Sequence, residues 1–288
     1  MISRLCRAQL FFLLLLLAAT GCDSNVDTRL AVEAGVDAFR AVTLSDEQVR
    51  LYAEQAAAQA DSENQIALPD NPQARRLAAL LNSPLRVDGH DFDVKVYLTD
   101  DVNAFAMADG TIRIYSGLMR MMNDQELLFV IGHEMGHVAR RHIRKKLVLA
   151  YAASAVRKGV AAQQEGGAGE LARSALGGFF EKLLKAQFSQ QEEREADDYG
   201  LAFMQSRGLD SEAAVTALQK LATLGKNHHF LSSHPAPAKR AERLRDRLDG
   251  KAVDDDDGEI SWLAAVWTWL KENLEALVRL VLALLNSL

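Results

Sequence analysis

The first part of the chain has the spacing of apolar residues that is typical of α-helices. Residues 23–42 are expected to form a tether or a first helix. Ser45 and Gln48 match a capping box, and they open a run rich in Ala, Glu and Gln. Prolines at 69 and 72 break this run, so we expect a second helix over residues 73–81.

Beyond the second helix, the pattern changes to that of β-strands. Residues 93–98 alternate and are rich in residues that favour strands. Two further runs of this kind, 103–107 and 111–115, flank Ala-Asp-Gly at 108–110. Asp-Gly is a strong hairpin signal because both residues tolerate a positive φ. The sequence therefore predicts a small antiparallel sheet.

Helical spacing returns at Asn123, which forms a second capping box with Glu126. The apolar positions of this helix continue into His-Glu-Met-Gly-His at 133–137. Residues 147–186 are rich in Ala and Gly but carry charges, so they predict a mobile helical arm with a loop at 166–167 rather than a membrane span. Further helices are expected over about 187–206, from 210 or 211 to about 225, and over the basic segment 239–247.

The N-terminus has the features of an export signal. A basic leader precedes the apolar run 10–19, which is too short to span a bilayer as a mature helix. The small residues and cysteine that follow resemble a bacterial lipoprotein signal, in which residues 1–21 are removed and Cys22 is acylated. Ala19 departs from that pattern, because Leu is more usual at the position three residues before the cysteine. An ordinary secretory signal with an incidental cysteine is the alternative.

Acylation of Cys22 would make residues 22–44 a lipidated tether in the bacterial cell envelope, facing the periplasm. Asp23 resembles a signal for retention in the inner membrane, so that membrane is favoured and the outer membrane is the alternative. Cys6 is lost with the signal, so no cysteine pair remains for a disulfide. Stability must then come from packing and from any bound metal.

The composition is that of an ordinary globular protein, with 49% hydrophobic and 25% charged residues. A net charge of −6 argues against nucleic acid as a partner, because no dominant basic surface is available to neutralise phosphates. The short basic stretch 140–146 is predicted to be a solvated helix face.

The C-terminal region reads as two segments. Residues 251–258 form an acidic linker, and 259–288 form an amphipathic helix rich in tryptophan. The four charged residues of this helix gather on one side and leave a wide apolar face. This face either docks on the protein core or lies in a membrane interface, and the pattern leaves both interpretations open.

The sequence at 133–137 carries the clearest chemistry. Residues four apart on a helix lie roughly 40° apart around its axis, so His133 and His137 project from one face and are suited to bind one Zn²⁺. Glu134 is suited to act as the general base that takes a proton from the attacking water and delivers it to the leaving amine. The alternative is an incidental pair of surface histidines. Gly136 suits a helix with a closely approaching neighbour.

A catalytic zinc needs a third protein ligand. The metzincin pattern fails, because Arg140 and Ile143 occupy its Gly and third His positions. His142 is about half a turn from His133 around the helix, and we expect it to face solvent.

The acidic run 192–198 is the other source of a third ligand. Glu193 and Asp197 lie four apart, so one can bind the metal while the other accepts a hydrogen bond from a ligand histidine. A solvated acidic stripe is the alternative, and the pattern alone does not separate Glu193 from Glu195.

Several short motifs together resemble the HtpX-like gluzincin peptidases. The resemblance extends to about residue 248 and implies an α+β fold, a mainly α-helical zincin with the small antiparallel sheet beside the HExxH helix. It selects Glu193 as the third ligand of one Zn²⁺ per chain and Asp197 as the supporting carboxylate. The tryptophan-rich tail departs from the family pattern. The motifs are His-Glu-Met-Gly-His at 133–137, Glu-Arg-Glu-Ala-Asp at 193–197, Asn-Ala-Phe-Ala at 103–106, Tyr-Ser-Gly-Leu-Met at 115–119, Gln-Phe-Ser-Gln at 187–190 and His-Pro at 234–235.

The resemblance also implies roles for one strand and one loop histidine. The strand Asn103, Ala104, Phe105 and Ala106 would line the cleft and pair with extended substrate, because a sheet edge binds any peptide through main-chain hydrogen bonds. His234 would approach the zinc and take a catalytic part by stabilising the oxyanion, or it would occupy the open metal position. An ordinary loop histidine is the alternative.

We therefore predict a zinc metallopeptidase domain over residues 45–250 that hydrolyses peptide bonds of misfolded or envelope proteins. Its partners would be unfolded or extended polypeptides and the membrane, which it reaches through the Cys22 lipid. The helix 259–288 would add a membrane contact only in the interpretation in which its apolar face lies in the interface. Two rivals are a zinc-containing chaperone or assembly factor with latent proteolysis and a non-catalytic lipoprotein. Intact Glu134 favours the enzyme, because a structural metal needs no general base.

Overall fold

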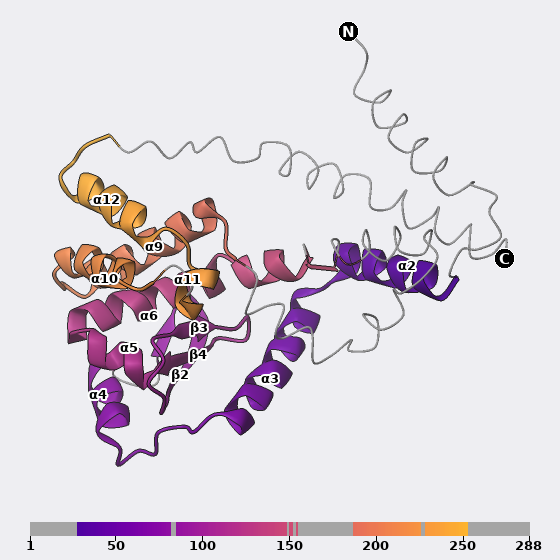
Figure 1. Ribbon diagram of the computed structural model, residues 1–288, viewed down its shortest axis with the longest axis horizontal. Helices are drawn as coiled ribbons and strands as arrows, with labels where there is room; N and C mark the ends of the chain where they lie inside the picture. Colours follow the sequence, from indigo (N-terminus) through magenta and orange to yellow (C-terminus); the bar gives the residue numbers. More distant parts are fainter. Residues whose placement is uncertain are drawn as a thin grey trace, which may run out of the picture.

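The computed structural model describes residues 28–81, 85–148, 150–151, 154, 187–225 and 228–252. The predicted signal with Cys22, most of the predicted arm, and the linker and tail from residue 253 onwards lie outside these residues. The described part is mainly helical with one small sheet, as predicted (Figure 1).

The elements follow the predicted order, helices first, then strands, then helices. The strands are β1 (Leu85–Val87), β2 (His90–Tyr97), β3 (Ala104–Ala106) and β4 (Thr111–Tyr115). The helices are α2 (Thr28–Thr43), α3 (Asp46–Glu63), α4 (Pro72–Leu81), α5 (Ser116–Met121), α6 (Asp124–Ala139), α9 (Gln190–Ser206), α10 (Glu212–Ala222), α11 (His229–Ser233) and α12 (Pro237–Leu248).

Two helices begin at the predicted capping boxes. At the start of α3, Ser45 Oγ accepts a bond from the backbone N–H of Gln48 at 3.2 Å, and Gln48 Oε1 accepts one from that of Ser45 at 2.9 Å. Asn123 and Glu126 make the same reciprocal pair at 2.9 and 2.7 Å, which places the first residue of α6 at Asp124. These bonds satisfy backbone donors that have no partner within the helix.

The sheet is mixed, and this corrects the prediction of a wholly antiparallel one. The predicted hairpin exists: β3 pairs antiparallel with β4, and Gly110 in its turn has φ +93°. The hairpin folds back so that β4, rather than β3, pairs with β2, and this pairing is parallel. The strand order is β1-β2-β4-β3, so β3 lies at an edge. The strands β2 and β3, which are consecutive in sequence, are therefore not neighbours in the sheet.

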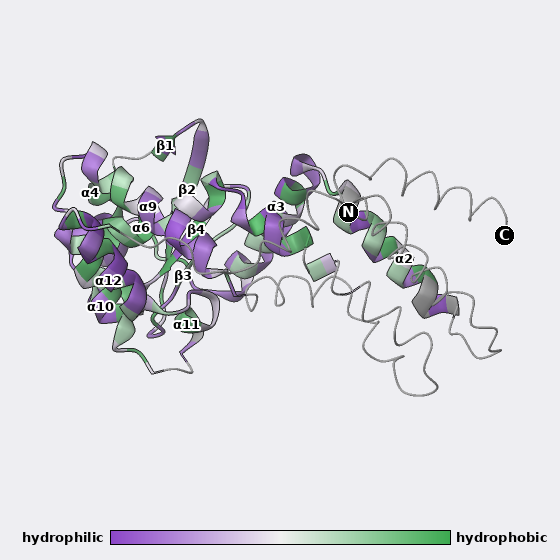
Figure 2. Ribbon diagram, turned by 90° about the horizontal axis from the view of Figure 1, so that it is seen from above, coloured by the Kyte–Doolittle hydropathy of each residue, from purple (hydrophilic) through white to green (hydrophobic). Residues whose placement is uncertain are grey.

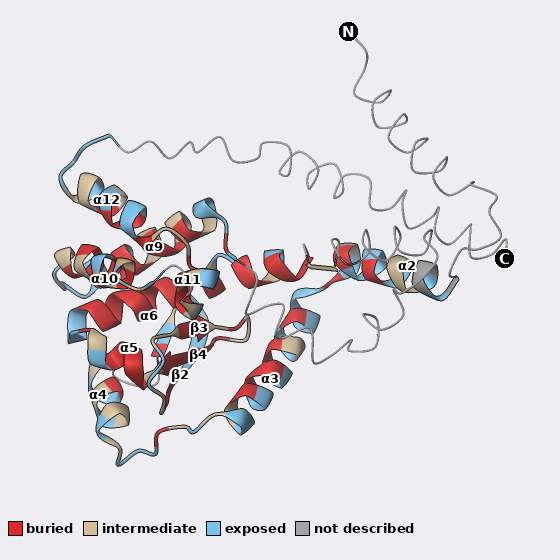
Figure 3. Ribbon diagram, viewed as in Figure 1, coloured by how far each residue is buried: buried red, intermediate tan, exposed pale blue. Residues whose placement is uncertain are grey.

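Helix α6 forms the centre of the domain, with the sheet on one side and α9 on the other (Figures 1 and 3). Every residue of α6 from Glu126 to Val138 is buried. Two glycines let α9 approach its backbone closely. A Cβ on Gly136 would lie 2.9 Å from Ala196 Cα, and one on Gly132 would lie 3.0 Å from Gly200 Cα. Gly136 therefore has the close helical neighbour that the sequence led us to expect.

Helix α2 stands apart from the body of the domain (Figure 2). It carries three exposed apolar side chains one turn apart, Val32, Val36 and Phe39. Among the described residues, we find no helix that combines the length and the apolar character needed to cross a membrane.

Candidate metal centre

Four buried side chains converge beside α6. His133 and His137 come from α6 and Glu193 comes from α9, while His234 directly follows α11. One donor atom from each lies within 4.8 Å of the other three. Exposed fractions of 0 to 2% show that all four are removed from solvent. The group brings together the three predicted metal ligands and the predicted loop histidine.

The spacing of α6 and α9 explains this convergence. His133 and His137 are one helical turn apart, and their Nε2 atoms lie 3.1 Å from each other. Glu193 is in the first turn of α9, and its carboxylate oxygens lie 3.7 Å from His133 Nε2 and 3.4 Å from His137 Nε2. The two Nε2 atoms and the carboxylate therefore face one common point.

The other nitrogen of His133 is fixed by a buried acid. His133 Nδ1 and Asp197 Oδ1 lie 2.9 Å apart, and Asp197 is fully buried. Donation from Nδ1 to a carboxylate leaves Nε2 with its lone pair towards the donor group, which is the usual arrangement for a metal-ligating histidine. This is the contact that the sequence predicted for Asp197.

Arg240 of α12 compensates the buried acids. It donates to both oxygens of Asp197, at 2.8 Å from Nε and 2.6 Å from Nη2, and it forms an ion pair with Glu193. Sequence reasoning missed this residue, because it belongs to a basic helix in which most charges face solvent. One signal was present in the sequence: Arg240 lies four residues before Leu244, so the two share a face of the helix. In the structure both residues are buried.

The charge states at the centre suit metal binding. Burial lowers the pKa of His137 well below its usual value. Burial by itself would raise the pKa of Glu193, but the charges of Arg240 and His234 outweigh it and hold that pKa well below its usual value. The pKa of Asp197 is also lowered, because Arg240 outweighs the effect of burial. Metal ligands must be unprotonated, so a neutral His137 and an ionised Glu193 fit this role.

The donor set also fits a divalent first-row metal. Imidazole nitrogens and a carboxylate oxygen are ligands that such metals accept, with zinc among them. Glu134 lies beside the group and is 1% exposed. Its Oε1 atom is buried without a hydrogen-bond partner among the described residues, and His234 Nε2 lies 3.5 Å away. A buried carboxylate oxygen of this kind is costly unless something else engages it.

The structure contradicts the prediction that His142 faces solvent. Its side chain is 0% exposed and lies beneath His137, with the two Nδ1 atoms 3.0 Å apart. The prediction extended the geometry of α6 beyond its end. Helix α6 stops at Ala139, Arg141 adopts φ +58°, and the chain starts a new helical turn at residue 142.

The same change of direction corrects the interpretation of the basic stretch 140–146. Its first part is solvated, and the Arg141 side chain is 69% exposed. Lys146, in contrast, is 6% exposed, with its Nζ 3.0 Å from the centre of the Phe188 ring. Burial lowers the pKa of Lys146 to about 7. Phe188 in turn stacks on His137, with ring centroids 3.7 Å apart.

The strand predicted to bind substrate is β3, next to α6. Ala104 and Phe105 are buried, and Ala106 is half-buried. The backbone of Asn103 accepts a bond from Tyr115 N at 3.0 Å, which extends the pairing of β3 with β4. Within the described residues, no strand pairs with the other edge of β3.

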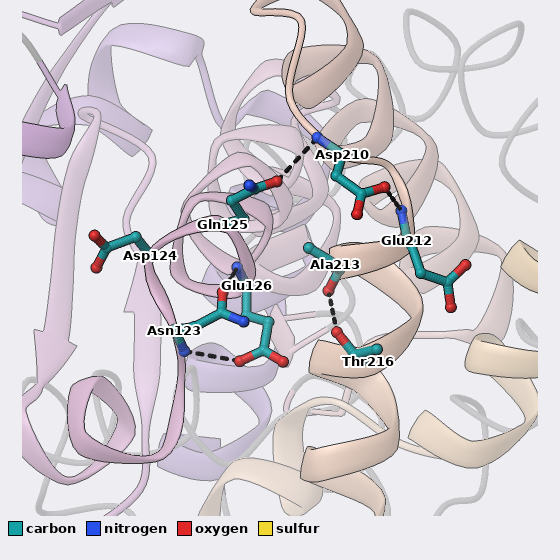
Figure 4. Close-up of a pocket in the computed structure, with 8 residues that line it drawn as sticks. All are labelled: Asn123, Asp124, Gln125, Glu126, Asp210, Glu212, Ala213 and Thr216. Atoms are coloured by element: carbon teal, nitrogen blue, oxygen red, sulfur yellow. Dashed lines mark hydrogen bonds between the residues drawn. The ribbon is translucent and has the colours of Figure 1, made fainter.

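A separate surface hollow lies where the N-terminal ends of α6 and α10 meet (Figure 4). Its acidic side chains are engaged within the fold. Glu126 completes a capping box and pairs with Lys220, and Glu212 pairs with Arg245. Gln125 accepts a bond from Asp210 N at 2.9 Å and so joins the two helices. This hollow contains none of the four converging donors.

The fold and the donor group define a class of protein. A zincin-type metallopeptidase has two histidines one turn apart on a helix and a glutamate between them in sequence. Its third metal donor is an acidic residue from a following helix, and this structure has all of these features.

The chain belongs to peptidase family M48, whose model matches residues 71–248. It is 43% identical to the metalloprotease LoiP of Escherichia coli (strain K12) over 251 residues, which cover 86% of this chain and 98% of that protein. It is 39% identical to the metalloprotease YcaL of the same organism, over 80% of this chain and 92% of that protein. A beta-barrel assembly-enhancing protease of that strain is 29% identical, over 62% of this chain and 42% of that protein.

These relationships confirm the resemblance found in the sequence, and the chain is a metalloendopeptidase. Both histidines of the pair on α6 belong to one buried donor group.

Proposed function

We propose that this protein is a zinc-dependent endopeptidase, tethered to a membrane in the bacterial periplasm, that cleaves misfolded or envelope proteins. The buried group of His133, His137, Glu193 and His234 carries this proposal. One Zn²⁺ per chain would be held by the first three, because two imidazoles and one glutamate are a common ligand set of catalytic zinc. One of the relatives is named for enhancing β-barrel assembly, which supports substrates in the envelope.

The residues around the metal group suit peptide hydrolysis. Bound zinc would polarise the scissile carbonyl and make an attacking water more acidic. Glu134 would accept a proton from that water and deliver it to the leaving amine, because its Oε1 is buried beside the group without a hydrogen-bond partner in the described residues. Asp197 would hold His133 in one tautomer and orientation, and Arg240 would keep Asp197 ionised.

The substrate class follows from the position of β3. An extended polypeptide could add to the outer edge of this strand through main-chain hydrogen bonds, which place its peptide groups alongside α6. Backbone pairing is largely indifferent to side chains. We therefore expect unfolded or extended segments to be cleaved in preference to folded domains.

Metal removal tests the proposed activity. Purified protein stripped with a chelator is expected to lose cleavage of casein, and one equivalent of Zn²⁺ per chain is expected to restore it, because Glu134 alone cannot supply the electrophile. Metal content by mass spectrometry and casein cleavage would be measured on the same samples. Full activity in the stripped protein would overturn the proposal, and restoration by another metal alone would reject zinc.

The tether is proposed from the sequence at residues 10–22, and the predicted signal lies outside the described residues. Helix α2 begins six residues after Cys22, so a lipid there would hold the domain close to the bilayer. The helix predicted over 259–288 would add a second contact. Asp23 favours the inner membrane.

Lipidation is tested by incorporation of labelled palmitate in growing bacteria. The Cys22→Ala variant is expected to lose the label, because the acylated thiol is gone. Cys6→Ala is the matched control, since Cys6 is removed with the signal, and it should label as the wild type does. Label on Cys22→Ala equal to that on the wild type would show that the lipid is carried elsewhere. Absence of label from both proteins would show that the signal is an ordinary secretory one.

A second candidate function is a chaperone or assembly factor with latent proteolysis. The observation in its favour is His234, whose Nδ1 lies 3.0 Å from Glu193 and 3.3 Å from His133 Nε2. A histidine in this place would take the fourth position of the metal, where water and substrate must bind. In that case the protein would bind polypeptides without cleaving them until the loop that carries His234 moves.

A further inference from the structure

His142 and Glu195 form a buried chain of polar contacts that ends on His137. His142 Nδ1 lies 3.0 Å from His137 Nδ1, and His142 Nε2 lies 2.9 Å from Glu195 Oε2. The imidazole of His142 is 0% exposed, and the Glu195 side chain is 33% exposed. Both nitrogens of a fully buried ring are therefore engaged, which avoids the cost of an unpaired buried polar group.

The order of donors in this chain can be assigned. The Nε2 of His137 faces His133 and Glu193, so a neutral His137 that offers this lone pair must carry its proton on Nδ1. Nδ1 of His142 is then the acceptor, and its own proton must be on Nε2. Glu195 accepts that proton's hydrogen bond, because an ionised carboxylate only accepts.

The carboxylate of Glu195 is surrounded by donors. Gln191 Nε2 donates to its Oε1 at 2.9 Å, and Lys145 Nζ lies 4.0 Å from its Oε2. Reversing the direction of the two hydrogen bonds would require Glu195 to be protonated and to donate. The carboxylate therefore fixes the direction of both hydrogen bonds.

We propose that His142 and Glu195 are positioning residues that hold His137 in the orientation and tautomer needed to bind the metal. This inference rests on the metal site of the proposed function. It gives His137 a support equivalent to the one that Asp197 gives His133, through one intervening ring. Such supporting contacts typically contribute a factor of about 10 to 100 in metal affinity.

His142 does not serve as a fourth ligand in this arrangement. Its Nδ1 meets the Nδ1 of His137, the nitrogen that is directed away from the donor group, and its Nε2 is taken by Glu195. The group of converging donors among the described residues does not include it. Its effect on the metal therefore passes through His137.

The test compares the zinc dissociation constants of variants of the full-length protein by chelator competition. His142→Phe keeps a ring of similar size but removes the acceptor, and we expect its Kd to rise by about 10- to 100-fold. His142→Asn restores an acceptor near the Nδ1 position, and we expect a Kd within about threefold of wild type. Glu195→Ala removes the fixed end of the chain and should weaken binding, whereas Glu195→Gln keeps an acceptor and should weaken it less. His90→Phe, on β2, is the control for the loss of an imidazole outside the metal group.

Thermal unfolding of each metal-free variant separates positioning from general stability. A positioning role predicts that His142→Phe binds zinc more weakly and that His142→Asn restores the binding. It also predicts that the unfolding midpoints of the metal-free variants do not follow the order of their zinc affinities. The inference is overturned if His142→Phe binds zinc like the wild type, or if Asn gives no rescue and both variants lose metal-free stability equally. Should His142→Phe fail to fold, the Glu195→Ala and Glu195→Gln pair decides in the same way. Failure of the wild type to bind zinc would instead reject the proposed metal site itself.

Discussion

Replacement of Glu134 by glutamine is expected to lower kcat/KM for casein by about 10²- to 10⁴-fold, the usual contribution of a general base. Glutamine has nearly the same shape as glutamate but cannot accept the proton of the attacking water. The side chain is 1% exposed, so bulk solvent does not offer a ready substitute base. Metal content should stay at the wild-type value, because Glu134 is not a member of the converging donor group.

The Glu54→Gln variant is the matched control for this change. Glu54 lies on the exposed side of α3, and the same loss of one carboxylate there should leave cleavage unchanged. Wild-type cleavage by Glu134→Gln would remove Glu134 from the mechanism. Loss of the metal along with activity would assign it a part in holding the metal. A metal-loaded wild type that cleaves nothing, under any condition tried, would favour the chaperone.

Local signals in the sequence were sufficient for most elements of the fold. The capping boxes at Ser45 and Asn123 and the Asp-Gly turn at 109–110 act over three or four residues, and each occurs where predicted. The parallel pairing of β2 with β4 was not predictable in this way. It depends on which of two neighbouring strands packs beside β2, and that choice is made by contacts distant in sequence.

The acidic run on α9 shows why the pattern left two glutamates open. Glu193, Ala196, Asp197 and Gly200 share the face that packs on α6, and all four are buried. Glu195 is on a different face and meets His142 instead. The helical period alone places the four buried residues on one face of α9. Only the packing against α6 shows that this face, rather than the one that carries Glu195, is turned towards the histidines.

The contacts that sequence reasoning missed are made by residues outside α6 and α9. His142 lies just beyond the end of α6, and Arg240 belongs to α12. His142 is buried because the backbone turns at Arg141, which has a positive φ that nothing in its side chain favours. Arg240 reaches Asp197 across more than forty residues of sequence. Each supports a predicted residue, so the motif identified the donors while the tertiary fold supplies the groups that hold them.

Removal of the imidazole of His234 is expected to raise casein cleavage by the metal-loaded protein. His234 is 2% exposed, stacks on Phe230 with ring centroids 4.7 Å apart, and has its Nδ1 3.0 Å from Glu193. A ligand that occupies the fourth metal position for 90 to 99% of the time lowers the apparent activity by about 10- to 100-fold. The His234→Ala variant should recover this factor, and its zinc affinity should fall as one donor is lost.

The opposite outcome has an equally definite meaning. If His234 instead stabilises the oxyanion, its loss should lower kcat by about 10²- to 10³-fold. The control is His228→Asn, which removes another imidazole just before α11 but keeps an acceptor for the backbone N–H of Phe230. Because His234 faces both Glu193 and Glu134, one histidine cannot leave the ligand group without changing the surroundings of the general base. Faster cleavage by His234→Ala, together with no change in His228→Asn, would therefore place latency in this side chain and assign proteolysis to the form in which it has moved away.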